Sequence, residues 1–198
     1  MSVVEFLLAG TLAAAMPLLL AALGELVVER TGGLNLGLEG MMALGAVIAF
    51  ICVYHSGSHL IGFLAAAIAG AAFAMVFAGL VLVIKANEVA AGLAIGVLGL
   101  GLSALFGKSY ESHTIKGLPD YRLPVLSEIP VIGPTFFTQD VVVWITVIGT
   151  ASLWYVLNKT KLGLIITAVG ENSEAARSIG YPVGAIRCAA IAFGGGMC

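Results

Sequence analysis

Charged and amide side chains are scarce in this sequence, and many of them fall in two short stretches. The first stretch, residues 24–40, holds Glu25, Asn35 and Glu39 beside long apolar runs. An ionisable group inside a bilayer is costly and usually serves a function. Asn35 and Glu39, with Asn87 further along, are therefore candidates for lining a pathway for a polar solute. A helix N-cap is an open alternative for Glu39, and for Asn87 the capping role is the favoured one.

The second stretch, residues 159–182, predicts a short helix over 173–179. Asn172 or Ser173 supplies an N-cap, and Glu174 lies in the electropositive first turn. Gly180 supplies a stop, because glycine readily adopts the left-handed conformation that ends helices. The helix would be about 10 Å long at 1.5 Å per residue.

A short rigid element of this kind suits insertion into a cleft on a partner protein. We expect Ala175, Ala176 and Ile179 to share one face of it. An amphipathic turn lying on lipid headgroups is the alternative interpretation. The candidate contact residues are Glu171, Asn172, Glu174, Ala175, Ala176, Arg177 and Gly180.

Catalytic and cofactor motifs are absent from the sequence. It has no GxxxxGK[ST] phosphate-binding loop, and its glycines lie mostly in apolar runs. The three cysteines are far apart, with no Cys/His cluster, so we expect neither a metal nor a cofactor. No Ser/His/Asp or Cys/His arrangement for catalysis is apparent, and the chain is expected not to be an enzyme.

The composition predicts an all-α, polytopic transmembrane helix bundle. Sixty per cent of the residues are apolar and 10% are charged, against about 25% charged in average soluble domains. The net charge of −2 also argues against nucleic-acid binding. Because a helical span needs about 20 residues, the charge-free runs predict five complete spans and a partial sixth in one domain, residues 1–198. The runs are 6–24, 40–84 (two spans divided at 54–59), 89–107, 141–158 and a last one from Val183 that Arg187 interrupts.

The connections predict the orientation, because cytoplasmic loops are enriched in Lys and Arg. Short polar connections are expected at 25–35 and 85–88, and a long external loop at 108–140. One side receives Arg30, Lys85, Lys159, Lys161 and Arg177, and the other receives Lys108, Lys116 and Arg122. The first side is expected to be cytoplasmic, which places the N-terminus outside and residues 159–182 inside.

Small residues recur at helical spacing within the predicted spans, as in Gly92, Gly96, Gly99 and Gly101 and in Ala66, Gly70 and Ala74. Such residues let helix backbones approach closely in a bilayer. Tight packing is the favoured explanation, and a pathway between sliding helices is the alternative.

The stretch from Leu162-Gly163 to Gly170-Glu171-Asn172, followed by Glu174-Ala175-Ala176-Arg177 and Gly180, resembles the cytoplasmic coupling segment of ABC-importer permeases. The branch is the one that serves branched-chain amino acids, ribose and nucleosides. The stretches 24–32, 34–42, 86–94 and 129–134 are similar to its nucleoside-type members, in the same order. Ser173 departs from the pattern, which commonly has proline there.

The resemblance implies a non-catalytic membrane subunit of an ATP-driven importer of a nucleoside or similar polar small molecule. Its implied partners are a cytoplasmic ABC ATPase, a second permease subunit and an extracytoplasmic substrate-binding protein, in a bacterial plasma membrane. Such permeases continue with more helices, so the sequence looks like the N-terminal portion of a longer permease. A non-ABC transporter or channel that uses Glu25 or Glu39, or an inactive membrane fragment, is the alternative.

Overall fold

The computed structural model describes residues 3–118 and 141–198, and throughout this part of the chain the regular structure is helical. Five helices are long and apolar enough to cross a membrane, which confirms the predicted bundle. They are α1 (Val3–Arg30), α2 (Leu38–Ser56), α3 (His59–Ala78), α4 (Glu88–Gly107) and α6 (Val141–Lys159). Three shorter helices follow: α7 (Lys161–Glu171), α8 (Ser173–Ser178) and α9 (Val183–Met197).

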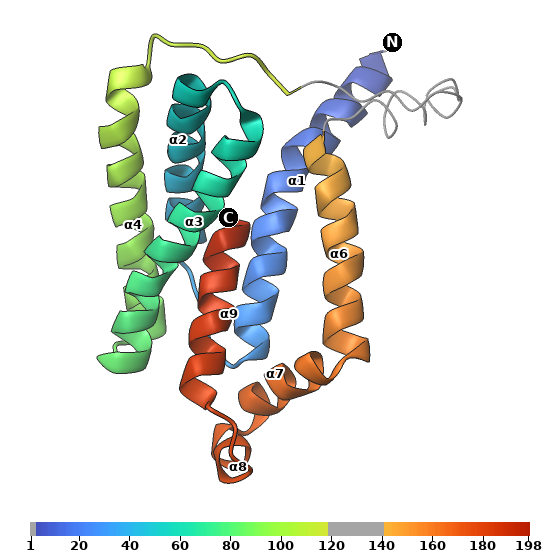
Figure 1. The fold of residues 1–198 in the computed structure, drawn as a ribbon, viewed down its shortest axis with the longest axis vertical. Coiled ribbons are helices and arrows are strands. Elements are labelled where there is room, and N and C mark those ends of the chain that lie inside the picture. The colour runs from blue at the N-terminus through green and yellow to red at the C-terminus, as the bar shows by residue number, and fades with distance from the viewer. Residues whose placement is uncertain (1–2, 119–140) are drawn as a thin grey trace.

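The helices stand side by side, with α7 and α8 at one end (Figure 1). Helix α3 packs against α2 and α9, and α4 packs on the far side of α2. Helix α9 also packs against α1, which in turn contacts α6. Helix α7 crosses the end of the bundle below α6 and α1, and α8 lies outermost (Figure 1).

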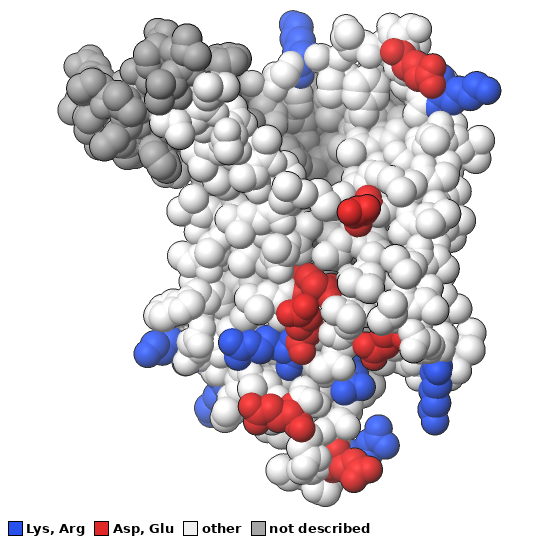
Figure 2. Space-filling model, turned by 180° about the vertical axis from the view of Figure 1, so that it is seen from behind, with Lys and Arg blue, Asp and Glu red and all other residues white. Residues whose placement is uncertain are grey.

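Burial in the bundle matches a protein whose surroundings are lipid. Met41, Ala74 and Phe77 are buried in the core, while large apolar side chains such as Ile68 and Val97 point outward. A soluble protein rarely exposes so much contiguous apolar surface. Charged side chains gather instead over the end that carries α7 and α8, with a smaller group at the opposite end (Figure 2).

Glycines set the spacing between several helices, as the favoured explanation of the small residues predicts. A Cβ placed at Gly40 of α2 would lie 2.7 Å from the Cα of Gly96 in α4, and one placed at Gly99 of α4 would lie 2.7 Å from the Cα of Gly40, so neither Gly40 nor Gly99 has room for a side chain. Gly24 of α1 meets Gly194 of α9 in the same way. Gly101 is an exception, because nothing lies within 4 Å of its Cβ position.

Three expectations about the connections need correction or addition. The first connection is shorter than 25–35, because α1 continues to Arg30 and the turn occupies residues 31–37. The helix extends because Glu and Arg are good helix formers and a basic residue is favourable in the last turn. The segment 159–182 contains α7 as well as the expected short helix. A π-helix (η1, Gly79–Val83) directly follows α3. A 3₁₀ turn (η2, Lys108–Tyr110) begins the expected loop 108–140. Residues 119–140 of that loop lie outside the described residues.

Candidate functional site

Helix α8 is a six-residue helix with an N-cap, and it lies at the charged end of the bundle. The Asn172 side chain accepts a hydrogen bond from the backbone N–H of Ala175 at 2.9 Å, so Asn172 is the N-cap. Gly180 adopts φ +99°, and the N–H of Tyr181 reaches back to the carbonyl oxygen of Ala176 at 3.1 Å. These contacts confirm the predicted start and stop of the helix.

The side chains of α8 face two ways, and the expectation of one shared small-residue face was wrong in part. Ala176 is buried against Val169 of α7 and Val183 of α9. Ala175 is exposed, and Ile179 is 76% exposed. One residue of helix turns a side chain by about 100°, so positions 175 and 179 stay together while 176 points inward. The outer surface also carries the exposed Glu171, Asn172, Glu174 and Arg177.

Helix α7 is amphipathic, unlike the membrane-spanning helices. Leu162 and Leu164 are exposed, whereas Gly163 and Val169 are buried against the bundle. Such a helix lies along a membrane surface with its apolar side toward lipid. Only Asn172 separates α7 from α8, so the two helices meet at a tight corner.

A second polar site lies in the turn 31–37, between α1 and α2. Two carboxylates from different helices accept adjacent backbone amides of this turn. Glu25 of α1 accepts from the N–H of Asn35 at 2.7 Å, and Glu88 of α4 accepts from the N–H of Leu34 at 2.9 Å. Glu25 is only 8% exposed, and the structure gives its second oxygen, Oε2, no hydrogen-bond partner. The carboxylates therefore satisfy backbone groups that the surroundings cannot.

Asn35 is fully buried, and its amide side chain is used within the turn. Its Oδ1 accepts from the N–H of Gly37 at 2.9 Å, and its Nδ2 lies 3.5 Å from the sulfur of Met41. This geometry fixes the chain direction into α2. Asn35 is thus placed as a residue that shapes the turn.

Glu39 and Asn87 are both exposed, unlike Asn35. Asn87 is the N-cap of α4, since its side chain accepts from the N–H of Ala90 at 3.0 Å, which confirms its favoured role. Glu39 lies in the first turn of α2, which has Gly37 at its cap and no side-chain cap hydrogen bond. The neighbouring Gly40 packs on Gly96, two turns or about 12 Å beyond the start of α4. Glu39 therefore lies well inside the bundle's length.

Arg187 contacts the turn 31–37, a contact that the sequence interpretation missed. It had appeared only as an interruption of the last apolar run. In α9 its Nε donates to the carbonyl oxygen of Thr31 at 3.0 Å, and a Cβ at Gly32 would lie 3.0 Å from its Nη2. The available signal was a single arginine within apolar sequence, which normally marks a specific partner.

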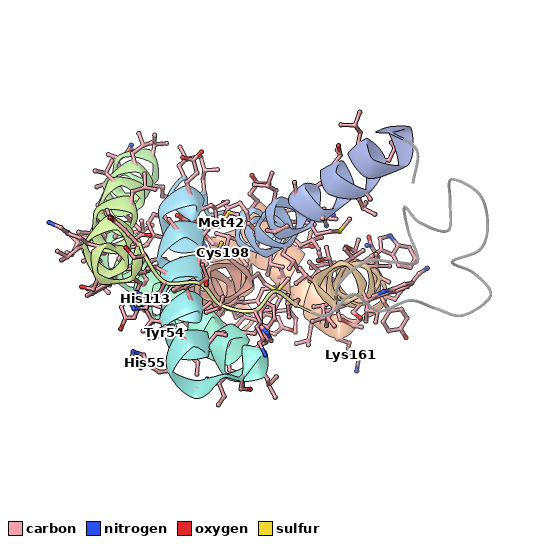
Figure 3. The ribbon with its side chains drawn as sticks, turned by 90° about the horizontal axis from the view of Figure 1, so that it is seen from above. Met42, Tyr54, His55, His113, Lys161 and Cys198 are labelled. Carbon is pink, nitrogen blue, oxygen red and sulfur yellow. The ribbon has the colours of Figure 1, made fainter. Side chains whose placement is uncertain are left out.

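Aromatic rings cluster at the end opposite α8, where Figure 3 shows Tyr54, His55 and His113 near one another. Tyr110 Oη lies 2.9 Å from His55 Nε2, and Tyr54 makes edge contacts with both histidines and with Tyr110. Within residues 3–118 and 141–198, no group of three or more His, Cys, Asp or Glu side chains is arranged to hold a metal ion. The cluster ties the end of α2 to the segment that follows α4.

Together, the apolar spans and the short helices at one end define a multi-pass helical membrane protein. The chain belongs to the family described as "Branched-chain amino acid transport system / permease component", whose model matches residues 7–198. No solved structure matches the chain.

Three curated proteins illustrate the similarity. TsgC13 of Haloferax volcanii, provisionally named as a glucose ABC transporter permease protein, is 38% identical over 99% of this chain and 61% of its own length. The guanosine ABC transporter permease protein NupQ of Bacillus subtilis is 33% identical over 91% of this chain and 60% of its own. The nucleoside ABC transporter permease protein NupC of Lactococcus lactis is 32% identical over 96% and 64%. The chain thus spans about three-fifths of the length of these relatives.

Proposed function

We propose that the chain belongs to the membrane-spanning subunit of an ATP-driven ABC importer and helps to form the pathway for a nucleoside or similar polar small molecule. The observation that carries the proposal is the capped α7–α8 corner at the charged end of a helical membrane bundle. The names of the relatives, which concern guanosine, nucleosides and glucose, support the class of substrate.

In this proposal the α7–α8 end is cytoplasmic. Arg30 and Lys159 are the last residues of α1 and α6 on that side, and Lys85 lies between η1 and α4. The basic residues of α7 and α8 add to them. The positive-inside tendency favours this orientation. Residues 159–182 are then the cytoplasmic coupling segment, residues 108–140 are the external loop, and the N-terminus lies outside, in a bacterial plasma membrane.

The subunit would carry out no chemistry of its own. A separate cytoplasmic ABC ATPase would hydrolyse ATP and receive α8 in a cleft, with exposed Glu174, Ala175, Arg177 and Ile179 as the contact surface. A second permease subunit and an extracytoplasmic substrate-binding protein complete the assembly that we propose.

Among the candidate pathway residues, Glu39 has the strongest support. It is exposed although it lies about 12 Å beyond the level at which α4 begins. A carboxylate at that depth needs water, a polar solute or a partner subunit beside it. Asn35 would contribute indirectly by shaping the turn, and Asn87 lies at the cytoplasmic mouth as a helix cap.

A charge reversal on α8 tests the proposal. Arg177→Glu is compared with Lys85→Glu, which makes the same change at an exposed position outside the segment. Tagged protein is purified from its own host's membranes, and co-purifying ABC ATPase is quantified by mass spectrometry. We expect Arg177→Glu to reduce the ATPase about tenfold, equivalent to about 1.4 kcal/mol, and Lys85→Glu to leave it unchanged. Equal recovery with Arg177→Glu, or no ATPase with the unmodified chain, would overturn the proposal.

A further inference from the structure

We propose that Gly170 and Arg187 are the positioning residues that transmit movement of α8 to the turn 31–37, and through it to α2 and α4. The inference rests on the proposed docking of α8 to an ATPase and adds the route by which that docking acts on the membrane-spanning helices. It is carried by contacts that converge on one short piece of backbone.

The first step is that α8 cannot move alone. Ala176 of α8, Val169 of α7 and Val183 of α9 form one buried cluster, with Ile186 packed against it. Close-packed apolar groups transmit displacement because they have no free volume in which to yield. A push on α8 therefore displaces the end of α7 and the start of α9 together.

The second step is that both of these helices touch the end of α1 and the turn. A Cβ at Gly170 of α7 would lie 3.0 Å from the amide nitrogen of Gly32 and closer still to the carbonyl oxygen of Arg30. The two backbones are thus in direct contact. Arg187 of α9 contacts the same segment, residues 30–32, through its hydrogen bond to the Thr31 carbonyl.

The third step is that the turn is fastened to the spans beyond it. Glu25 and Glu88 hold the amides of Asn35 and Leu34, which attaches the turn to α1 and α4. A Cβ at Gly92 of α4 would lie 2.8 Å from the amide nitrogen of Leu36, so the turn and α4 also pack backbone to backbone. Displacement of residues 30–32 must therefore move or strain the start of α2 and its contact with α4.

Gly170→Ala is the variant that tests this route, with Gly184→Ala as the matched control. Gly184 lies in the first turn of α9, and its Cβ position has nothing within 4 Å. Alanine raises helix propensity at both positions, so a defect at 170 alone reports the lost contact. A cysteine introduced at position 36, where Leu36 is exposed, reports movement of the turn 31–37 through its rate of labelling. The native cysteines Cys52, Cys188 and Cys198 are first replaced by serine.

The complex with its ATPase is labelled by a maleimide, with and without ATP plus vanadate. In the Leu36→Cys protein we expect nucleotide to change the labelling rate. Gly170→Ala should keep the ATPase bound and hydrolysing ATP but lose that change, and Gly184→Ala should keep both. A change of labelling rate that persists in Gly170→Ala overturns the route while leaving ATPase docking intact. Loss of the ATPase from the unmodified complex would instead overturn the proposed function.

If Gly170→Ala does not fold, Arg187→Gln tests the same route. It removes the guanidinium donor to Thr31 without adding volume. The same loss of nucleotide-dependent labelling, with ATPase retained, is expected. A labelling response equal to that of the Gly184→Ala control overturns the inference.

Discussion

The buried carboxylate of Glu25 leads to a prediction in which two substitutions at one position have different effects. Its Oε1 accepts the Asn35 amide at 2.7 Å, and its Oε2 is buried without a hydrogen-bond partner. Glu25→Ala leaves the amide unsatisfied in a buried place, which costs about 1–3 kcal/mol. Glu25→Gln keeps an acceptor oxygen and removes the need to bury a charge, so it should retain the stability of the unmodified protein or exceed it.

The assay is thermal unfolding of the purified protein in detergent, followed by intrinsic fluorescence. A loss of 1 kcal/mol lowers the midpoint by roughly 2–4 °C in a domain of this size. Glu25→Ala should therefore unfold several degrees lower. Glu29→Ala is the matched control, because Glu29 is exposed one turn away and its loss should change stability by no more than about 0.5 kcal/mol.

Two results would refute this reasoning. If Glu25→Ala unfolds at the same temperature as the unmodified protein, the carboxylate does not hold the turn. If Glu25→Gln is as unstable as Glu25→Ala, the negative charge matters more than the acceptor that it provides.

Three further predictions follow from single contacts. Asn172→Ala removes the cap of α8 and should destabilise that helix by about 0.5–2 kcal/mol, seen as weaker ATPase co-purification, whereas Asn172→Asp keeps the acceptor and should bind normally. Gly99→Leu should abolish monodisperse protein in size-exclusion chromatography because a Cβ at that position would lie 2.7 Å from the Cα of Gly40 in α2, and Gly101→Leu, which has open space, should not. Tyr110→Phe loses the hydroxyl bonded to His55 and should lower the unfolding free energy by about 0.5–1.5 kcal/mol, measured by chemical denaturation; an unchanged value would mean that water replaces that contact.

The spans and helix α8 were predictable because their signals are local. Charge-free runs of about 20 residues indicate membrane helices, and the Asn172 cap and the Gly180 stop lie within one short stretch. Helix α7 was missed because its 11 residues are too few to span a bilayer and its role depends on what it packs against. Its buried side includes Gly163 and Val169, which no composition rule singles out.

The turn 31–37 was less accessible to sequence interpretation because its hydrogen bonds join residues far apart in the sequence. Glu88 lies in the first turn of α4, yet its carboxylate accepts the Leu34 amide of another connection. Arg187 and Thr31 are separated by most of the chain. Helix packing determines which partner such a polar group meets, and the periodicity of the sequence does not predict that packing.

The early start of α2 inside the bundle also constrains how the chain can be inserted. Charged side chains on an isolated helix entering the bilayer cost about 2.5–3.5 kcal/mol each near its centre. Joint entry of α1 and α2 as a hairpin is favoured because it gives the Glu25 carboxylate its hydrogen bond from the Asn35 amide. Even then the turn lacks its outside bonds, since Glu88 comes 54 positions after Leu34 and Arg187 comes 156 positions after Thr31. The hydrogen bond from Arg187 to the Thr31 carbonyl therefore forms only after α9 has been made, long after the synthesis of α1 and α2.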